Sequence, residues 1–323
     1  MRSRGVALAL LALALAGCPA EHPQSALHPA SQEAGRIARL WWVMLGVYGA
    51  VTLATFALLA AALLRRRGAE APGGGVRFVV VAGIVVPTVI LVGMLFYSLR
   101  VSTALHLPEA AFTVRVTGFQ WWWDVRYPDH DIVTANELYV PVGEVVRLEL
   151  RAADVVHSFW VPNLHGKMDL LPEHPNQFWL RAEVPGVYRG QCAEFCGLQH
   201  ALMAFDVVAL PKDEFERWVA ERRRPHPEPA DDELRLGQEV FFSAGCNACH
   251  AVGGTDAVAL VGPDLTHIGT RRTLGAGTVA NTRGDLAGWI SQPQVLKPGN
   301  LMPPTYLEPR ELHALVRWLE TLR

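Results

Sequence analysis

Cysteine is scarce in this sequence, and charge of either sign is low. The 323-residue chain contains five cysteines, which form two close pairs and one N-terminal singleton. A disulfide framework usually joins distant segments, so this spacing argues against one. Charged residues make up 19% of the chain and the formal net charge is -2. Without a basic excess, no nucleic-acid partner is expected. Half of the residues are hydrophobic, and the length suffices for about two or three compact units.

The N-terminus has the pattern of an export signal. Arg2 and Arg4 precede the apolar run Val6–Ala16, which ends in Leu-Ala-Gly-Cys18. A basic start, a short apolar core and small residues before a cut are typical of such signals. The run is too short to cross about 30 Å of hydrocarbon. The ending resembles a bacterial lipobox, so we expect a lipoprotein-type signal over residues 1–17 and lipidation of Cys18. The alternative is a plain signal with an incidental cysteine.

Two longer apolar runs predict a transmembrane hairpin over residues 36–104. Leu40–Leu64 and Phe78–Leu99 are each long enough to span a bilayer as a helix. The loop between them contains four arginines, Arg65, Arg66, Arg67 and Arg77. Positive loops stay on the cytoplasmic side, so both tails should lie on the periplasmic or outer face of a bacterial plasma membrane.

A β-rich domain is predicted over residues 107–220. Apolar and polar residues alternate over Phe112–Val116 and Val146–Leu150, as in half-buried strands. Turn signals recur, for example at Pro128-Asp129 and Pro185-Gly186. Short strands at this spacing indicate an all-β sandwich or barrel.

A cluster of soft metal ligands lies in this predicted β-domain. The segment from Cys192 to Met203 also contains Cys196 and His200, and His157 lies upstream. Thiolate, imidazole and thioether are copper-type ligands. A mononuclear blue-copper site needs one cysteine, so the second thiolate indicates a second copper bridged by both sulfurs. The alternatives are zinc, which has little use for Met203, and a disulfide, which leaves the histidines without a purpose.

A third unit is predicted over residues 234–323, after a charged, proline-containing linker over residues 221–233. Its motif Cys246-x-x-Cys249-His250 is the attachment motif of c-type haem, in which the histidine binds the iron. Cytochromes c pair that histidine with a methionine, and Met302 is the methionine after the motif. His267 and His313 are the alternative sixth ligands. A thioredoxin-like redox pair is the other interpretation, but no βαβ pattern surrounds it.

Together these motifs resemble cytochrome c oxidase subunit II with a fused C-terminal cytochrome c domain, the caa3 type. The cysteine loop resembles that of the binuclear copper A centre, and the aromatic segment Gly118–Asp124 precedes the barrel as in that family. The resemblance implies a multidomain protein with a two-helix transmembrane hairpin, an all-β cupredoxin-like barrel and an all-α class I cytochrome c domain. The implied copper A ligands are His157, Cys192, Cys196, His200, Met203 and the backbone carbonyl of Glu194.

The resemblance also implies a role for each remaining motif. Trp121 would accept electrons for copper A, and the Glu194 carboxylate would face a magnesium ion at the contact with subunit I. Electrons would pass from an external donor, such as a cytochrome c or a bc1-type complex, to haem c, copper A and haem a of subunit I. Subunit I, with haem a, haem a3 and copper B, would reduce oxygen to water and pump protons; subunit III and membrane lipid are further partners.

Three alternatives stay open at this point. The chain has the parts of a copper A subunit of a nitric oxide reductase, whose catalytic partner would differ. Nitrous oxide reductase also has a copper A loop, but two spans and the lack of a second copper cluster argue against it. A membrane-anchored, non-enzymatic copper or electron carrier is the third, and the fused haem motif argues against it.

Overall fold

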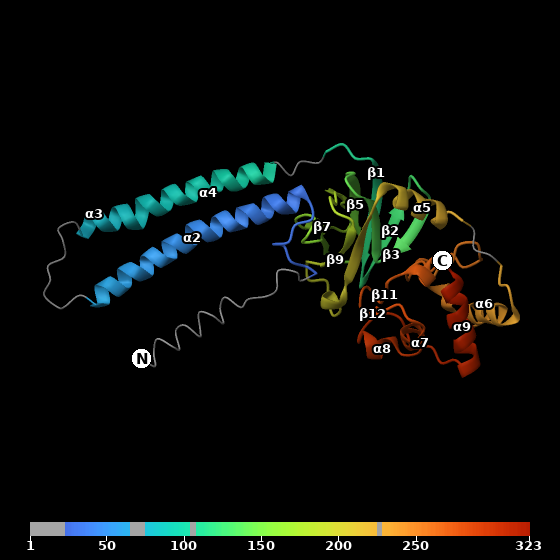
Figure 1. The fold of residues 1–323 in the computed structure, drawn as a ribbon. Coiled ribbons are helices and arrows are strands. Elements are labelled where there is room, and N and C mark those ends of the chain that lie inside the picture. Colours follow the sequence, from blue (N-terminus) through green and yellow to red (C-terminus); the bar gives the residue numbers. More distant parts are fainter. Residues whose placement is uncertain (1–22, 65–74, 104–107, 225–227) are drawn as a thin grey trace, which may run out of the picture. The chain divides into compact units, whose positions relative to one another are not determined.

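The computed structural model describes residues 23–64, 75–103, 108–224 and 228–323 (Figure 1). The predicted export signal, Cys18 and the arginines at positions 65–67 lie outside these residues. The chain divides into two compact units, residues 32–107 and a unit that combines residues 1–31 with 108–323. Each unit is described by itself.

The first unit consists of two apolar helices, as the hydrophobic runs predict. They are α2 (Gln32–Leu64) and a second helix built from α3 (Gly75–Val80), the π-helical turn η1 (Val81–Val85) and α4 (Val86–Thr103). Both are long and apolar enough to cross a membrane. In the π-helical turn, the N–H of Val86 donates to the carbonyl of Val81. The turn ends two residues before Pro87, which has no backbone N–H to donate.

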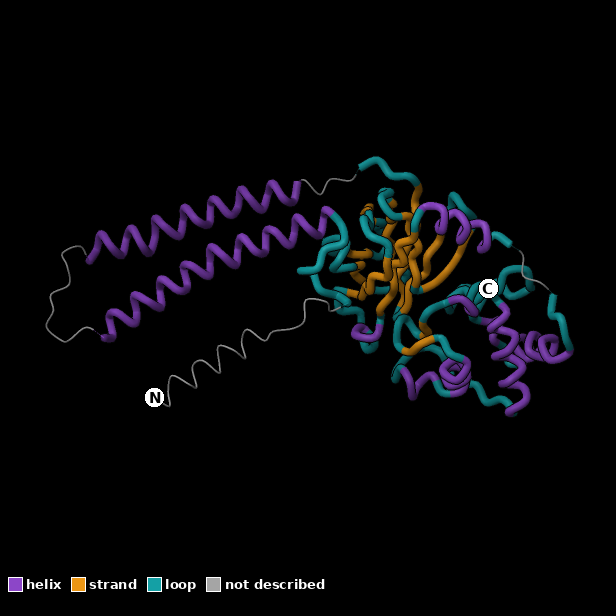
Figure 2. Tube along the Cα trace, viewed as in Figure 1, coloured by secondary structure: helices purple, strands orange, loops and turns teal. Residues whose placement is uncertain are grey.

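The β-domain of the second unit contains two five-stranded sheets, drawn in orange in Figure 2. One sheet has the order β3-β2-β1-β5-β8 and the other β4-β10-β9-β6-β7. The strands are β1 (Phe112–Phe119), β2 (Trp122–Tyr127), β3 (Ile132–Ala135), β4 (Glu137–Pro141), β5 (Val146–Ala152), β6 (His157–Trp160), β7 (Met168–Leu170), β8 (Asn176–Leu180), β9 (Gly186–Cys192) and β10 (Ala204–Leu210). The predicted cupredoxin-like all-β class is confirmed.

The core of the β-domain forms from the alternating residues of the strands. Val114 and Val116 of β1 and Leu148 and Leu150 of β5 are at most 1% exposed, as their period-two spacing predicts. Phe159 of β6 is also buried, and its ring stacks on that of Phe205. This packing fixes β6, β9 and β10 as neighbours, so the residues at their ends converge.

The three consecutive tryptophans depart from simple alternation. Strand alternation predicts that either the middle ring or the two outer rings enter the core. Instead Trp123 is 1% exposed while Trp121 and Trp122 are half-buried. The reason is a turn at Gln120 and Trp121 between β1 and β2, so alternation begins only at Trp122. Trp121 therefore lies in the turn between β1 and β2, half-buried against the edge of the core.

The segment after the β-domain is more helical than a linker. Helix α5 (Lys212–Arg222) lies against the β-domain through Phe215 and Trp218, and the Trp218 ring stacks on Tyr139. The next helix, α6 (Asp232–Ser243), begins with Asp231 as its cap, whose side chain accepts from the N–H of Leu234. Helix therefore occupies both ends of the segment predicted as a linker.

The C-terminal helical domain packs α6 against the closing helix α9 (Pro309–Thr321). Leu315, Val316 and Leu319 of α9 are buried, as their spacing predicts. Its other elements are the turns η3 (Cys246–Ala248) and η4 (Ile268–Thr270), the strands β11 (Thr273–Leu274) and β12 (Val279–Ala280), and the helices α7 (Arg283–Ser291) and α8 (Pro293–Leu296). The predicted all-α cytochrome c class is confirmed.

This domain contacts the β-domain within the same compact unit. The N–H of Arg272 donates to the carboxylate of Glu137 over 2.6 Å, and the N–H of Ala204 donates to the carbonyl of Ala276 over 3.0 Å. The Arg272 side chain also lies 3.5 Å from the carboxylate of Asp206. These contacts join Glu137, Ala204 and Asp206 of the β-domain to the C-terminal part of the chain.

Candidate functional site

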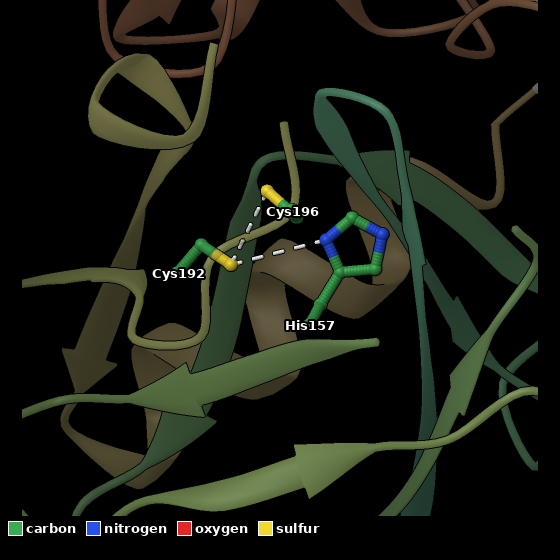
Figure 3. A group of neighbouring side chains, drawn as sticks. All are labelled: His157, Cys192 and Cys196. Atoms are coloured by element: carbon green, nitrogen blue, oxygen red, sulfur yellow. Dashed lines mark hydrogen bonds between the residues drawn. The ribbon is translucent and has the colours of Figure 1, made fainter. Parts of the chain in front are cut away.

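The cysteine loop connects two adjacent strands. Cys192 ends β9, and the loop runs through the short turn η2 (His200–Leu202) to Met203, which directly precedes β10. The N–H of Cys192 donates to the carbonyl of Met203 over 2.9 Å, which closes the loop. His157 begins β6, which pairs with β9. Sheet pairing thus brings the upstream histidine beside the loop (Figure 3).

All five side chains predicted to bind copper lie together. The Sγ of Cys192 is 3.8 Å from Nδ1 of His157 and 3.7 Å from the Sγ of Cys196. The Sγ of Cys196 is in turn 3.7 Å from Nδ1 of His200 and 3.8 Å from Sδ of Met203. The carbonyl oxygen of Glu194 is 3.2 Å from the Sγ of Cys192, so it too faces the cluster.

These separations fit metal binding and exclude a disulfide. A disulfide holds its sulfurs about 2.05 Å apart, and both thiols are free. Two donors that share one tetrahedral ion at bonds of about 2.0–2.3 Å lie roughly 3.3–3.8 Å apart. The donor pairs of the cluster match or nearly match this range. A thioether beside two thiolates favours copper over zinc.

The surroundings of the cysteine pair favour loss of one thiol proton. A hydrogen bond from the Cys196 thiol lowers the pKa of Cys192 despite its burial, and the contact with His157 acts in the same direction. The same hydrogen bond between the two cysteines raises the pKa of Cys196. One thiolate is therefore present at neutral pH, and a bound cation would displace the second proton.

Asp154 orients the His157 ring. Its Oδ1 lies 2.8 Å from Nε2 of His157, which directs Nδ1 toward the cysteines. Burial opposes ionisation of Asp154, but hydrogen bonds from His157 and from the N–H groups of Val155 and Gln120 hold its pKa below the usual value. The ring is thus oriented with Nδ1 toward the cysteine sulfurs.

Trp121 contacts the cysteine loop directly. Its Nε1 donates to the carbonyl oxygen of Cys196 over 3.1 Å, and Nε2 of Gln120 donates to the same oxygen over 2.7 Å. Gly197 follows with a φ of +114°, and a Cβ there would lie 3.2 Å from the Trp121 ring. Glycine is needed for both the backbone conformation and the close approach.

The carboxylate of Glu194 has a different partner from its carbonyl. It lies 3.6 Å from Nζ of Lys167, and both side chains are exposed. The two groups therefore form an ion pair at the surface, where Nζ of Lys167 also donates to the carbonyl of Ala193 over 3.4 Å.

A cavity of about 260 Å³ is lined by the haem-motif residues of the C-terminal domain and, on one side, by Trp121 and Trp122 of the β-domain. Cys246, Cys249 and His250 form one part of the lining and Met302 another. Apolar side chains complete it, among them Phe241, Leu265, Ile268, Leu286, Ile290, Leu315 and Leu319. Neither alternative sixth ligand lines this cavity. His313 is exposed and lies 3.1 Å from Glu233, and His267 is buried elsewhere.

The His250 ring is held in the tautomer that binds iron. Its Nδ1 lies 2.7 Å from the carbonyl oxygen of Pro263, so Nδ1 carries the proton. Nε2 is then unprotonated, and its lone pair is available to a metal. Burial lowers the pKa of His250 and keeps the ring neutral. A Cβ on Gly262 would lie 2.6 Å from the ring, so only glycine fits there. The residues present therefore fit a covalently attached haem.

Comparison with protein families matches residues 131–210 to the periplasmic domain of cytochrome c oxidase subunit II and residues 234–323 to cytochrome c. Cytochrome c oxidase subunit 2 of Alkalihalophilus pseudofirmus is 35% identical, over 99% of this chain and 97% of that protein. The chain belongs to the cytochrome c oxidase subunit 2 family. Its cytochrome c domain is fused at the C-terminal end, which confirms the caa3-type resemblance.

The chain is also similar to one further relative and to one solved structure. Subunit 2 of Bacillus sp. strain PS3 is 38% identical over 65% of this chain and 62% of that protein. The periplasmic domain of subunit II from Bradyrhizobium japonicum is 33% identical, covering 36% of this chain and 97% of that chain with a TM-score of 0.36. With two candidate membrane helices beside a domain of a periplasmic family, the chain is a membrane-anchored member of the cytochrome c oxidase subunit 2 family.

Several site residues escape sequence reasoning. Asp154 lies three positions before His157, and this short spacing is the sequence feature that could have indicated their contact. Gln120 shows no sequence signal, because it acts through a backbone contact formed only in the fold. Pro263 lies in the segment Gly262–Leu265, which resembles the segment that usually follows the haem motif in class I cytochromes c, but the hydrogen bond of its carbonyl with His250 is visible only in the structure. Arg271 is a further case, since it is buried beside the haem cavity and donates to the carbonyl of Asp264.

Proposed function

We propose that this subunit 2 receives electrons at a haem c in its C-terminal domain and passes them through a binuclear copper A centre to haem a of subunit I. Subunit I would then reduce oxygen to water and pump protons. One observation carries the proposal: Trp121 belongs to both sites. Its Nε1 donates to the carbonyl of Cys196, and the residue also lines the cavity that contains the haem motif.

The chain would hold its two groups with residues of distinct chemistry. Cys246 and Cys249 would form thioethers with haem, and His250 and Met302 would be the iron ligands. The copper A ligands would be His157, Cys192, Cys196, His200, Met203 and the carbonyl of Glu194. When bound, iron and copper supply reversible one-electron changes. The protein supplies orientation: Asp154 and Pro263 fix the two histidine rings, and apolar side chains exclude water from the haem cavity.

The remaining roles concern the surroundings of the subunit. The two helices would form a multi-pass hairpin with both tails on the periplasmic or outer face, and Cys18 would carry lipid. Glu194 would offer its carboxylate to a magnesium ion at the contact with subunit I, since that side chain is exposed. Subunit III and an external donor, such as a cytochrome c or a bc1-type complex, would complete the assembly.

The test is to purify the full chain in detergent and record its metal content and spectra. The proposal expects two copper ions per chain, an EPR signal of one unpaired electron shared between two copper nuclei, and the absorption of a covalently bound haem. Cys196→Ser should abolish the shared signal and leave the haem spectrum. A single copper, or zinc, in the wild-type chain would contradict the copper A assignment.

A further inference from the structure

Lys297 is a buried lysine between the β-domain and the C-terminal domain. It is 2% exposed, whereas the side chains of the other two lysines of the chain, Lys167 and Lys212, are 51% and 68% exposed. Lysine is almost never fully buried unless it is paired. Its Nζ donates to the carbonyl oxygen of Trp121 over 3.0 Å and to that of Gly275 over 2.8 Å. The first bond joins residues 176 positions apart.

On the haem side, Lys297 belongs to the loop that presents Met302. Nδ2 of Asn300 donates to the carbonyl of Lys297 over 2.7 Å. Oδ1 of Asn300 accepts from the N–H of Met302 over 2.8 Å. The backbone positions of Lys297 and Met302 are therefore coupled through one side chain.

On the copper side, the acceptor of Lys297 is the residue that contacts the cysteine loop. Trp121 donates from Nε1 to the carbonyl of Cys196 and accepts at its own carbonyl from Lys297. Four hydrogen bonds, linked by the covalent frameworks of Asn300, Lys297 and Trp121, thus connect Met302 to Cys196. Both Lys297 and Trp121 also line the haem cavity.

We propose that Lys297 is a positioning residue for electron transfer within this chain, where its ammonium group holds the Met302 loop against the Trp121 turn. This inference rests on the proposed function, because it assumes haem c in the cavity and copper A in the cysteine loop. The ammonium group touches neither centre and acts through Trp121 and the loop.

Burial of Lys297 is favourable only while the Met302 loop packs against the Trp121 turn. Removal from water lowers the pKa of Lys297 to about 8, and the smaller Coulombic effect of Cys196 acts in the opposite direction. The group is still charged at neutral pH, and its desolvation is offset only when both carbonyls accept. The interface has other contacts, such as Arg222 to Thr270 over 2.6 Å. Removing Lys297 should therefore loosen the Met302–Trp121 contact without separating the domains.

Amine acetylation of the full chain in detergent tests the contact without relying on electron transfer. The chain has three lysines, so mass spectrometry can follow each one. Lys167 and Lys212 should react at least about tenfold faster than Lys297, because modification of a buried amine requires local opening. Reaction of Lys297 at the rate of the other two would overturn the proposal, and this result does not depend on any variant folding.

The rate of electron transfer from photoreduced haem c to copper A then tests the positioning role of Lys297. Lys297→Met removes two hydrogen bonds from a charged donor, so we expect the rate to fall about tenfold or more. The haem absorption and the copper EPR signal should stay as in the wild type, which a general loss of structure would not allow. Lys212→Met, the same change at an exposed lysine, should transfer at the wild-type rate.

A Lys297→Met chain that has both spectra and transfers electrons at the wild-type rate would overturn the role of Lys297 alone. A wild-type chain without the copper A signal or without haem c would instead overturn the proposed function. The two failures are therefore distinguishable.

Discussion

Replacing Asp154 with asparagine should weaken copper binding without touching a copper ligand. The carboxylate accepts three N–H groups. Oδ1 accepts from Nε2 of His157 over 2.8 Å and from the N–H of Val155 over 2.7 Å, and Oδ2 accepts from the N–H of Gln120 over 2.6 Å. An asparagine has one acceptor oxygen and one NH2 group in place of these two oxygens. Whichever way it turns, its NH2 group faces at least one donor.

The expected loss of copper affinity depends on which hydrogen bond the asparagine cannot accept. If the amide NH2 faces His157, the ring loses the acceptor that directs Nδ1 toward Cys192. If it faces Gln120, the turn that carries Trp121 loses its anchor, and the negative charge is lost in either case. Removing the partner of a metal-binding histidine typically lowers metal affinity about 10–100-fold, which is roughly 1.4–2.7 kcal/mol.

The measurement is a competitive titration of the full chain in detergent against a copper chelator, followed by absorption and EPR. Asp169→Asn is the matched control, because Asp169 lies on the neighbouring strand β7 opposite Ser158. The control should bind copper within about twofold of the wild type. If Asp154→Asn binds as tightly as the control, packing against neighbours such as Trp123, and not Asp154, sets the orientation of His157.

Three further predictions concern the C-terminal domain and the β-domain. A Cβ on Gly237 would lie 2.2 Å from the carbonyl oxygen of Ala314, so Gly237→Ala should destabilise the chain by about 1–3 kcal/mol in denaturant unfolding; Gly284→Ala, with open space around it, should not. Met302→Ala should remove the low-spin, methionine-ligated haem spectrum, and a spectrum that persists would assign the sixth ligand to another residue. Burial lowers the pKa of His165 from 6.5 to about 4. The contribution of His165 to the free energy of unfolding is therefore constant above about pH 6.5. As the pH drops toward 4, that free energy falls by about 3 kcal/mol, because the unfolded chain binds a proton that the folded chain does not. His165→Gln should reduce that slope, and equal slopes for the two chains would refute the assignment to His165.

Local motifs determine much of this protein, because their chemistry needs few residues and short spacings. The haem motif places Cys246, Cys249 and His250 within five positions, so no long-range folding is needed to see that they act together. The same holds for Cys192, Cys196, His200 and Met203, which one loop carries. The two apolar runs and the alternation in β1 and β5 are equally local, since they follow from helix length and strand period.

The tertiary structure alone decided how these parts meet. His157 lies beside Cys192 because β6 pairs with β9, and the turn at Trp121 breaks the alternation that three tryptophans in a strand would follow. The contact of Lys297 with the Trp121 carbonyl has no counterpart in the sequence, because backbone carbonyls are present at every position and only the fold selects one. Residue types reveal which groups can bind metal and haem, but the distances between those groups depend on which distant segments pack together.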